Sequence, residues 1–500
     1  MCSLTSSPEV SFGLLVITVW RALTFVLVIF GCSSTFGAAE PLPNILLIVS
    51  DDQRPDTISA LGSPHLRTPA FDRLVQRGSA FTRCISPNPI CTPARAELLT
   101  GCTGFRNGVL NFGGPVNPEL PTLPRLLERI GYQRYYVGKW HNDGKPVTRG
   151  YTATRGLFCG GGGKYATPQQ DWAGREVTGY RGWIFQDDDG TLHPEQGVGL
   201  TAEISSKFAD AAIEVLQESD QRQAPCFLHV NFTAPHDPLL IPPQMQPLAR
   251  PQALQLPGNF LASHPFDHGN FAGRDELLFR QPRTPEETLA ELSVYYAVIM
   301  DLDQQVGRIL DAVDQLDTER ETLIVFTSDH GLAVGSHGLR GKQNMYEHTV
   351  GVPLLLAGPG VPQGRQFAAQ CTLRDILPTV LELAAGPQWQ QQMSQREAQP
   401  QNAAIAVDGR SLVPVLLGKQ TEVHPFVTGY FHDFQRMIRA GNWKYVEYPA
   451  VEQQQLFDLE QDPLEMNNLA GTSDHAEQKS KLRLQMYDWF AACGDAVLQR

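Results

Sequence analysis

The chain has 500 residues, of which 42% are hydrophobic and 19% are charged, and its formal net charge is −13 at pH 7. This length predicts a large domain accompanied by a smaller one, and the composition is typical of a soluble globular protein. The excess of acidic residues argues against nucleic acid or an anionic membrane surface as a partner, because both would be repelled. An anionic substrate would therefore need a site that creates positive potential locally.

The N-terminus has the pattern of an export signal. Residues 12–31 contain two apolar runs, FGLLVITVW and ALTFVLVIFG, which Arg21 separates, and the small residues of SSTFGAAE follow. We expect residues 1–39 to be removed after Ala39, leaving an exported periplasmic or extracellular protein with no stable membrane span. A lipoprotein signal at Cys32 and an uncleaved N-terminal anchor are the alternatives, although the arginine disfavours a clean span.

Apolar runs without alternation predict strands that are buried on both faces. These runs are NILLIVS (44–50), YYVG (135–138), CFLHVNF (226–232), TLIVFTS (322–328) and VPLLLAG (352–358). Helix start and stop signals lie between them, at 68–78, at 122–131 and in a long helix from Thr284, where Glu287 completes a capping box. This order predicts an α/β domain with a large, mostly parallel central sheet flanked by helices.

Other segments break this pattern. Residues 151–200 and 238–285 are rich in turn residues and predict loop insertions, and residues 387–402 are rich in glutamine and predict an exposed loop. The last part of the chain predicts a small antiparallel sheet followed by a terminal helix. We therefore expect an export signal at 1–39, a catalytic domain at 40–386, a linker at 387–410 and a C-terminal subdomain at 411–500.

The stretch PICTPARAELLTG (89–101) predicts a helix with a cysteine at its N-terminal end. Thr92 is a suitable N-cap, Pro93 suits the first helical position, and Gly101 follows the run as a C-cap glycine should. Cys91 would then lie where backbone N–H groups favour an anion or a thiolate, one turn from Arg95.

The cysteine count leaves two interpretations of Cys91 open. Nine cysteines become seven when Cys2 and Cys32 leave with the signal, an odd number for an exported chain. Cys91 is therefore a candidate nucleophile, but it is equally a candidate for a disulfide with Cys84 or Cys102.

The residues that follow four of the predicted strands share a chemistry. Ligands of open α/β sheets bind beyond the carboxyl ends of the strands, so side chains at those ends are expected to converge. They are Asp51, Asp52, Lys139, His141, His236, Asp329 and His330. The three carboxylates offer the hard oxygen ligands that Ca²⁺ or Mg²⁺ prefers, while His330 leaves zinc or manganese open.

Basic side chains at the same place would bind a small tetrahedral anion. Lys139, His141 and His236 follow strands, Arg95 lies on the cysteine helix, and Lys342 lies in GLRGKQNMYEH. A dication would offset the charge of the carboxylates and of an incoming anionic ester. For Lys342, a solvated loop lysine is the alternative.

The ordered set of motifs resembles the sulfatase family. CTPAR (91–95) resembles the sequence that directs conversion of a cysteine to formylglycine, and the resemblance covers residues 43–470. The other landmarks, in order, are NILLIVSDDQRPD, GYQRYYVGKWH, the PH of TAPHDP, TSDHG, the GK at 341–342 and FDLEQDPLEMNNLA.

The resemblance implies an alkaline-phosphatase-like fold and a role for each matching residue. One divalent cation, usually calcium, would be held by Asp51, Asp52, Asp329, His330 and the modified Cys91; many members have asparagine where this chain has His330. Arg95 would support the formylglycine hydrate, and Lys139 and Lys342 would bind sulfate oxygens. His236 would bind substrate and protonate the leaving alcohol, with Lys342 as second candidate, and His141 would help to release the sulfate.

The function implied is hydrolysis of a sulfuric ester, with a sulfated small molecule or saccharide as substrate and a formylglycine-generating enzyme as maturation partner. A carbohydrate is the favoured substrate. A phosphodiester or phosphonate monoester hydrolase of the same superfamily is one alternative, and an exported binding protein that never matures Cys91 is another. Four aromatic residues of the loop insertion are candidates either for stacking on sugar rings or for packing the loop itself: Tyr165, Trp172, Tyr180 and Trp183.

Overall fold

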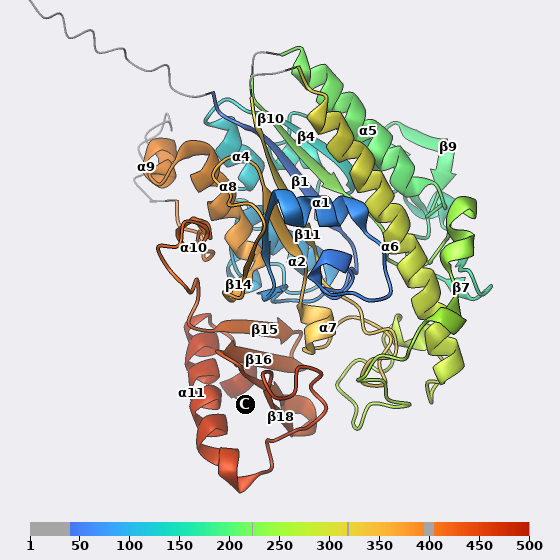
Figure 1. The fold of residues 1–500 in the computed structure, drawn as a ribbon, viewed down its shortest axis with the longest axis vertical. Helices are drawn as coiled ribbons and strands as arrows, with labels where there is room; N and C mark the ends of the chain where they lie inside the picture. The colour runs from blue at the N-terminus through green and yellow to red at the C-terminus, as the bar shows by residue number, and fades with distance from the viewer. Residues whose placement is uncertain (1–40, 223, 318–319, 395–404, 500) are drawn as a thin grey trace, which may run out of the picture. The chain divides into compact units, whose positions relative to one another are not determined.

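The computed structural model describes residues 41–222, 224–317, 320–394 and 405–499 (Figure 1). The predicted export signal lies outside these residues. Contacts divide the chain into Met1–Glu40 and Pro41–Arg500, and the second unit contains all of the described ranges. None of the helices in these ranges is long and apolar enough to cross a membrane.

A ten-stranded sheet forms the centre of this unit. In spatial order its strands are β13 (Arg365–Phe367), β2 (Gly78–Phe81), β12 (Leu354–Ala357), β11 (Thr322–Ser328), β1 (Asn44–Ser50), β10 (Cys226–Asn231), β4 (Gln133–Lys139), β5 (Ala153–Gly160), β8 (Trp183–Gln186) and β9 (Leu192–Val198). The five strands from β11 to β5 run parallel, which confirms the predicted large, mostly parallel sheet.

Two segments of this sheet differ from the sequence expectation. The run 352–358 forms β12, which pairs antiparallel with β11. A strand that is buried on both faces is apolar throughout whether it runs parallel or antiparallel to its neighbour, so the apolar run alone does not predict the direction of β12. The predicted loop insertion at 151–200 contributes β5, β8 and β9 and extends the sheet at one edge, as well as the small hairpin of β6 (Gln169–Gln170) and β7 (Glu176–Val177).

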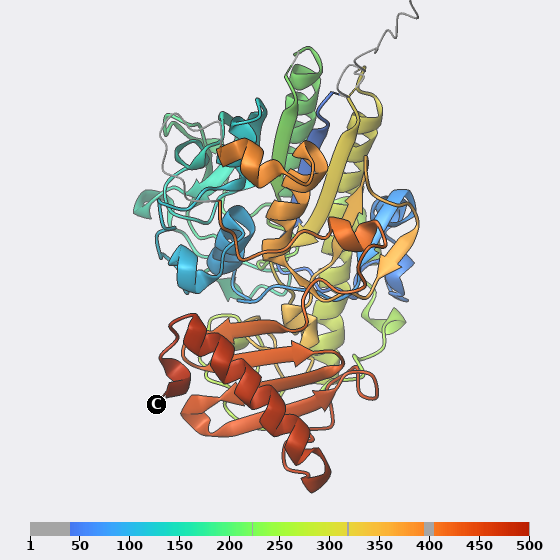
Figure 2. The ribbon, with the colours of Figure 1, turned by 90° about the vertical axis from the view of Figure 1, so that its left-hand side faces the viewer.

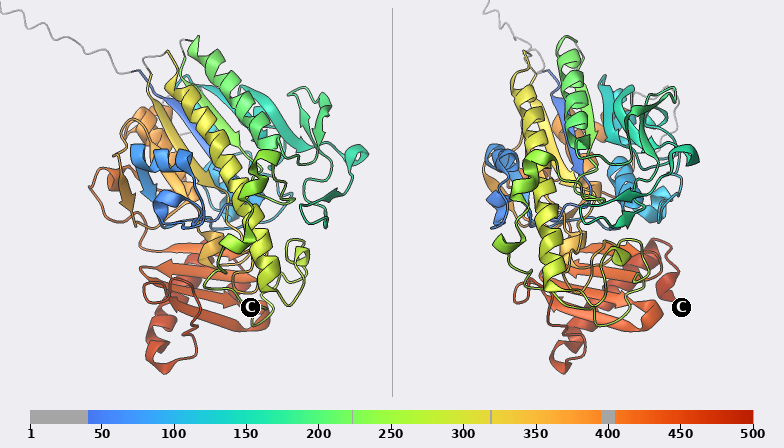
Figure 3. Two further views of the ribbon diagram at one scale, coloured as in Figure 1. Left: turned by 45° about the vertical axis from the view of Figure 1, so that its right-hand side comes forward. Right: turned by 90° about the vertical axis from the view of Figure 1, so that its right-hand side faces the viewer.

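Helices cover both faces of the sheet (Figure 3). One face carries α1 (Pro69–Arg77), α5 (Ile204–Asp220) and α6 (Pro285–Asp314), and the other carries α2 (Cys91–Thr100), α4 (Leu123–Glu128) and α8 (Ile376–Ala385). The predicted N-cap of α6 is confirmed, because the Thr284 side chain accepts a hydrogen bond of 3.2 Å from the Glu287 N–H. Helix α4 is shorter than the predicted 122–131.

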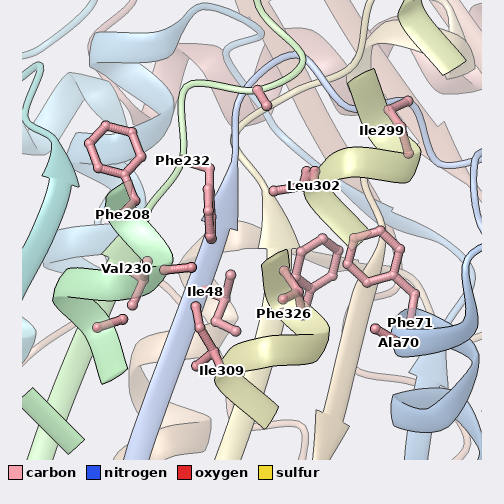
Figure 4. Close-up of a cluster of buried hydrophobic side chains, with 14 of the residues drawn as sticks. Ile48, Ala70, Phe71, Phe208, Val230, Phe232, Ile299, Leu302, Ile309 and Phe326 are labelled. Carbon is pink, nitrogen blue, oxygen red and sulfur yellow. The ribbon is translucent and has the colours of Figure 1, made fainter. Parts of the chain in front are cut away.

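The side chains of β1 alternate between the two apolar cores. Leu46 and Ile48 face the core under α1, α5 and α6, whereas Ile45, Leu47 and Val49 face the core under α2, α4 and α8. Figure 4 shows Ile48 beside Phe326 of β11 and Val230 of β10, with residues of α6 around them: Ile299, Leu302 and Ile309. Each parallel strand is therefore buried on both sides, which holds its carboxyl end in a fixed place.

A second sheet forms near the C-terminus (Figure 2). Strands β15 (Val427–Phe431), β16 (Gln435–Ala440), β17 (Trp443–Tyr448) and β18 (Gln453–Asp458) pair antiparallel in that order. Helix α11 (Ala476–Ala492) buries Leu482, Met486 and Phe490 against this sheet. The predicted small antiparallel sheet and terminal helix are thus confirmed.

The glutamine-rich segment contains a helix. Residues Trp389–Ser394 form α9, with Trp389 and Met393 buried against the core under α8, so this part is not the exposed loop that the sequence suggested. The spacing i, i+4 places both apolar side chains on one helical face. Residues 395–404 of the predicted linker lie outside the described residues.

Short elements complete the fold. They are β3 (Cys84–Ile85) paired with β14 (Cys371–Thr372), α3 (Gly104–Asn107), α7 (Glu347–Val350), α10 (Val413–Leu416), and 3₁₀ turns at Ser59–Leu61, Pro146–Arg149, Gly163–Tyr165, Pro243–Leu248, Pro251–Ala253, Glu276–Leu278, Leu373–Asp375, Pro449–Val451, Ser473–His475 and Val497–Gln499.

Candidate active site

Helix α2 begins at Cys91, two residues earlier than the predicted start at Pro93. The Ile90 carbonyl accepts the first helical hydrogen bond, from the Ala94 N–H at 3.0 Å, so Ile90 and not Thr92 occupies the N-cap position. The predicted C-cap is confirmed, with Gly101 in the left-handed region at φ 65°. Every residue of α2 is buried, which places Cys91 at a covered helix start and not on the surface.

Strands β11, β1, β10 and β4 lie side by side and bring their carboxyl ends to Cys91. The predicted site residues Asp51, Asp52, Lys139, His141, His236, Asp329 and His330 all follow or end these strands. Lys342 comes from the segment after β11, and Arg95 comes from α2. The structure therefore places all the predicted site residues in one cluster.

Three groups surround the Cys91 sulfur. Its Sγ lies 3.4 Å from Asp51 Oδ1, 3.4 Å from His330 Nε2 and 3.4 Å from Lys342 Nζ. Burial alone would raise the pKa of this thiol, but the charges of Lys139, Lys342 and His330 outweigh burial and hold the pKa well below its usual value. The site therefore has the local positive potential that an anionic substrate of this acidic chain requires.

Each carboxylate has a basic partner. Lys139 Nζ donates to Asp51, and Lys342 Nζ lies 2.8 Å and 3.1 Å from the two oxygens of Asp52. Arg95 Nε lies 3.0 Å from Asp329 Oδ2. Burial, and after it the charge of the neighbouring Asp51, raise the pKa of Asp329 to about 7.

The donor set fits a hard divalent cation. Asp51, Asp52, Cys91 and His330 each offer one ligand atom, and these atoms lie within 4.8 Å of one another. Asp329 adds a third buried carboxylate, whose Oδ1 accepts the Asp52 N–H at 3.2 Å. Since like charges buried together are costly, a dication among these oxygens would offset their repulsion.

The backbone is specialised where β1 and β4 reach the site. Asp52 has φ 69°, an uncommon conformation for a residue other than glycine. Gly138 precedes Lys139 with φ 91°, and a Cβ there would lie 2.1 Å from the Asn231 carbonyl oxygen. Only glycine allows β4 and β10 to approach this closely while presenting Lys139.

A cavity of about 360 Å³ opens beside Cys91. Its lining combines the site residues with aromatic and polar side chains: Phe112, His141, Thr178, Tyr180, Trp183, His236, Asn270, Arg274, Asp275, Lys342 and Gln343. A volume in this range suits a small-molecule ligand.

The two histidines of the cavity differ in environment. Burial lowers the pKa of His141 to about 4, and its ring packs against Trp183 and Phe112 at centroid distances of 5.0 Å and 5.6 Å. Burial and Lys342 oppose the charged form of His236, but Asp52 and Asp237 outweigh them and raise its pKa. His236 Nδ1 lies 2.6 Å from the Asp237 carbonyl oxygen, which orients the ring.

Sequence reasoning missed three partners of the site. The Tyr180 hydroxyl donates to Asp51, Arg95 Nη1 donates to Asn231, and Arg274 Nη2 lies 3.0 Å from the Asp237 carboxylate. Asn231 is the last residue of β10, so the strand-end rule could have found it. Tyr180 was predicted only as an aromatic candidate for sugar stacking or loop packing, and nothing in the local sequence indicates that its hydroxyl reaches Asp51 or that Arg274 reaches Asp237.

The four aromatic candidates separate into two pairs. Tyr180 and Trp183 line the cavity, whereas Tyr165 and Trp172 are not among the described residues that do. Trp172 instead donates a hydrogen bond of 2.8 Å from Nε1 to Glu291 of α6. Trp172 is therefore held against α6 and does not line the cavity beside Cys91.

Comparisons with known proteins agree with this architecture. The family model named Sulfatase matches residues 43–387, and a second model, N-sulphoglucosamine sulphohydrolase, C-terminal, matches residues 335–491. The chain is 29% identical to a choline-sulfatase of Rhizobium meliloti, over 91% of this chain and 89% of that protein. It is 27% identical to an N-acetylgalactosamine-6-sulfatase of Canis lupus familiaris, over 93% of this chain and 83% of that protein.

A solved structure supports the fold. The phosphonate monoester hydrolase of Agrobacterium radiobacter superposes with a TM-score of 0.69 at 24% identity, covering 90% of this chain and 96% of that one. The fold is therefore that of the alkaline-phosphatase-like hydrolases. Within that class the chain belongs to the sulfatase family, since the family model matches more than half of it, and the protein is a sulfuric ester hydrolase.

Proposed function

We propose that the protein removes sulfate from a sulfated carbohydrate, with a nucleophile made from Cys91. The observation that carries this proposal is the position of Cys91, at the start of a buried helix and 3.4 Å from both an acidic and a basic side chain. Two observations support a sugar substrate. One relative is named N-acetylgalactosamine-6-sulfatase, and the cavity of about 360 Å³ beside Cys91 has aromatic and polar walls.

The nucleophile is proposed to be formylglycine, formed from Cys91 by a formylglycine-generating enzyme. The motif CTPAR supports this conversion. When present, formylglycine supplies an oxygen nucleophile in place of the thiol. Arg95 lies on α2, one turn after Cys91. Its guanidinium donates hydrogen bonds to Asp329 and Asn231, and it thereby holds the Asp329 carboxylate in place.

The metal is proposed to be one divalent cation, calcium by preference. Asp51, Asp52, Asp329, His330 and the modified Cys91 would hold it. The preference for calcium follows from the carboxylate oxygens, which suit it better than a soft metal. A bound dication supplies positive charge that polarises the sulfate and favours the departure of the alcohol.

The remaining site residues are proposed to bind the sulfate and move protons. Lys139 and Lys342 are buried ammonium groups beside Cys91 and offer N–H donors to sulfate oxygens. His236 lines the cavity where a leaving oxygen would emerge and is the first candidate to protonate it, with Lys342 as the second. His141 lies on the same cavity wall as Cys91 and is the candidate base.

Export is also proposed, with residues 1–39 as the signal. The two apolar runs before SSTFGAAE support it. The domain limits at 40–386 and 411–500 are likewise proposed, and the two family models, which match residues 43–387 and 335–491, support a catalytic part followed by a C-terminal part.

Peptide mass spectrometry and a substrate panel test the proposal. The chain should be produced with a formylglycine-generating enzyme, and we expect the mass loss of conversion at Cys91 and an unmodified thiol at Cys102, the matched cysteine beyond the other end of α2. Sulfated monosaccharides and oligosaccharides should be compared with choline sulfate, an aryl sulfate and an aryl phosphodiester by kcat/KM. An intact Cys91 thiol in an active enzyme, or a preference for the phosphodiester, would contradict the proposal.

A further inference from the structure

A second and larger cavity lies at the opposite end of α2 from Cys91. Its volume is about 550 Å³, and its walls come from α3, the 3₁₀ turn at Leu373–Asp375, residues 408–410, the start of β15 and the end of α11. Because the ten residues of α2 span about 15 Å, this cavity is separate from the catalytic cluster. We call it the arginine pocket, after Arg106, Arg374 and Arg410, which line it.

The arginine pocket has an excess of positive groups. Among the described residues, its lining contains three arginines but only one carboxylate, Asp408. Both oxygens of Asp408 are already used, by Arg106 Nη1 at 2.9 Å and by the Thr103 N–H at 2.8 Å. Such an excess is unusual in a chain whose net charge is −13, and it favours an anionic ligand.

Arg374 has hydrogen-bonding capacity that the protein does not use. The residue is only 6% exposed, and its Nη1 has no hydrogen-bond partner. The carboxylate of Glu97 lies 3.8 Å from Arg374 Nε, beyond hydrogen-bond distance. A buried donor without a partner costs about 1–3 kcal/mol, which an anionic oxygen in the pocket would recover.

Neither acidic group behind the pocket hydrogen-bonds Arg374 Nη1. Asp375 accepts from the Arg410 N–H at 2.7 Å, from the Thr372 N–H at 2.7 Å and from His424 Nε2 at 2.9 Å. Glu97 accepts at Oε1 from the Gly104 N–H at 3.2 Å and from a tyrosine hydroxyl of β15, while its Oε2 faces Arg374 Nε without a hydrogen bond. Glu97 therefore offsets part of the Arg374 charge but leaves the Nη1 donor without a partner.

Aromatic rings form the other walls. Phe105, Phe426 and Trp489 line the same cavity, and Phe105 and Trp489 meet edge to face with centroids 6.4 Å apart. Aromatic faces pack against the apolar C–H faces of sugar rings, while guanidinium groups bind sulfate or carboxylate oxygens. The combination fits a ring that carries a negative charge.

We propose that the arginine pocket binds an anionic sugar unit, bearing a sulfate ester or a carboxylate, as a second saccharide site apart from the catalytic cluster. Arg374 would contact the anionic group and the aromatic rings would hold the sugar ring. The preference for a sugar rests on the proposed carbohydrate substrate, whereas the requirement for an anion rests on the arginines alone.

Calorimetric titration of the full mature chain tests this site. N-acetylglucosamine 6-sulfate is the probe, and Cys91→Ala prevents its turnover. We expect two binding events per chain, of which the Arg374→Lys variant weakens one at least about tenfold, because lysine keeps the charge beside Glu97 but loses the planar fork. Uncharged N-acetylglucosamine should not occupy the pocket.

Matched variants keep the result interpretable. Arg410→Gln changes an exposed residue of the pocket and should weaken the same event without risk to folding. Arg308→Gln removes one arginine from a distant ion pair with Asp210 and should leave both events unchanged. A single binding event in the Cys91→Ala chain, or pocket variants that titrate like Arg308→Gln, overturns the proposal.

Catalysis is measured separately. With Cys91 intact, Arg374→Lys should hydrolyse a small aryl sulfate at the wild-type rate, because that substrate needs only the catalytic cluster. Loss of the second binding event with full aryl sulfatase activity supports the arginine pocket. Two binding events without any activity on sugar sulfates would instead contradict the proposed carbohydrate substrate but not the proposed anion site in the arginine pocket.

Discussion

Removing the Tyr180 hydroxyl should damage the site through Asp51. Tyr180 is 6% exposed and Asp51 is fully buried, and the hydroxyl donates to the carboxylate that also accepts from Lys139. Burial raises the pKa of the Tyr180 phenol well above its usual value, so the hydroxyl remains a donor at any working pH. We infer that Tyr180 positions Asp51 for the cation.

The size of the effect follows from the kind of hydrogen bond. A hydrogen bond to a charged group contributes about 1.5–3 kcal/mol, and each 1.4 kcal/mol corresponds to a factor of about ten. The Tyr180→Phe variant should therefore lose about 10- to 100-fold in kcat/KM for an aryl sulfate, or an equal factor in affinity for the cation. Removal of a residue that supports a metal ligand has effects of this size.

The assay is a calcium titration of aryl sulfatase activity, with the melting temperature measured in parallel. Tyr132→Phe is the matched control, because its hydroxyl is also buried and donates a hydrogen bond of 2.7 Å to the Pro43 carbonyl, away from the site. We expect both variants to fold and to lose some stability, but only Tyr180→Phe to lose activity or calcium affinity. Wild-type kcat/KM and unchanged calcium dependence in Tyr180→Phe would refute the reasoning.

Three further outcomes are expected. Cys91→Ser should lose sustained turnover by more than about 100-fold, because serine supplies a hydroxyl but not an aldehyde; multiple-turnover kinetics like those of the wild type would rule out formylglycine. Chelation with EDTA should abolish activity and lower Tm, and calcium should restore both better than magnesium; full activity after exhaustive chelation would exclude the cation. Replacing His268, which is 1% exposed and whose ring nitrogens have no hydrogen-bond partner, should flatten the pH dependence of stability. Burial lowers the pKa of His268 to about 3, so the unfolded chain takes up the proton first and the wild type loses stability as pH falls below about 6.5, by about 2 kcal/mol at pH 5. His268→Leu should therefore gain about 2 °C in Tm relative to wild type between pH 7.5 and pH 5, measured by thermal unfolding, and a constant difference would contradict this sign.

His193, whose pKa is shifted in the opposite direction, serves as the control for the His268 prediction. Hydrogen bonding to Asp187 raises the pKa of His193, so its contribution to stability is present at low pH and is lost as pH rises through the folded value. His193→Leu should shift the Tm difference in the direction opposite to His268→Leu.

The central sheet and the residues at its edge could be predicted from the amino-acid sequence. Runs such as NILLIVS and TLIVFTS match β1 and β11 residue for residue, because a strand buried on both faces must be apolar throughout. Since parallel strands end at the same edge, residues as distant as Asp51 and Asp329 were predicted to meet, and the structure brings them together.

The partners that complete the site emerge only from the folded chain. Tyr180 and Arg274 lie in irregular segments, and no local pattern indicates that their side chains reach Asp51 and Asp237. The arginine pocket likewise joins residues from five separate parts of the chain.

These differences between sequence and structure have a common physical reason. Periodicity reports which face of an element is buried, but it does not report the direction of a neighbour, as β12 shows, or the partner of a buried polar group, as Arg374 shows. The strand direction and the polar partners depend on contacts between residues far apart in the chain, which form only when the two apolar cores pack against the sheet.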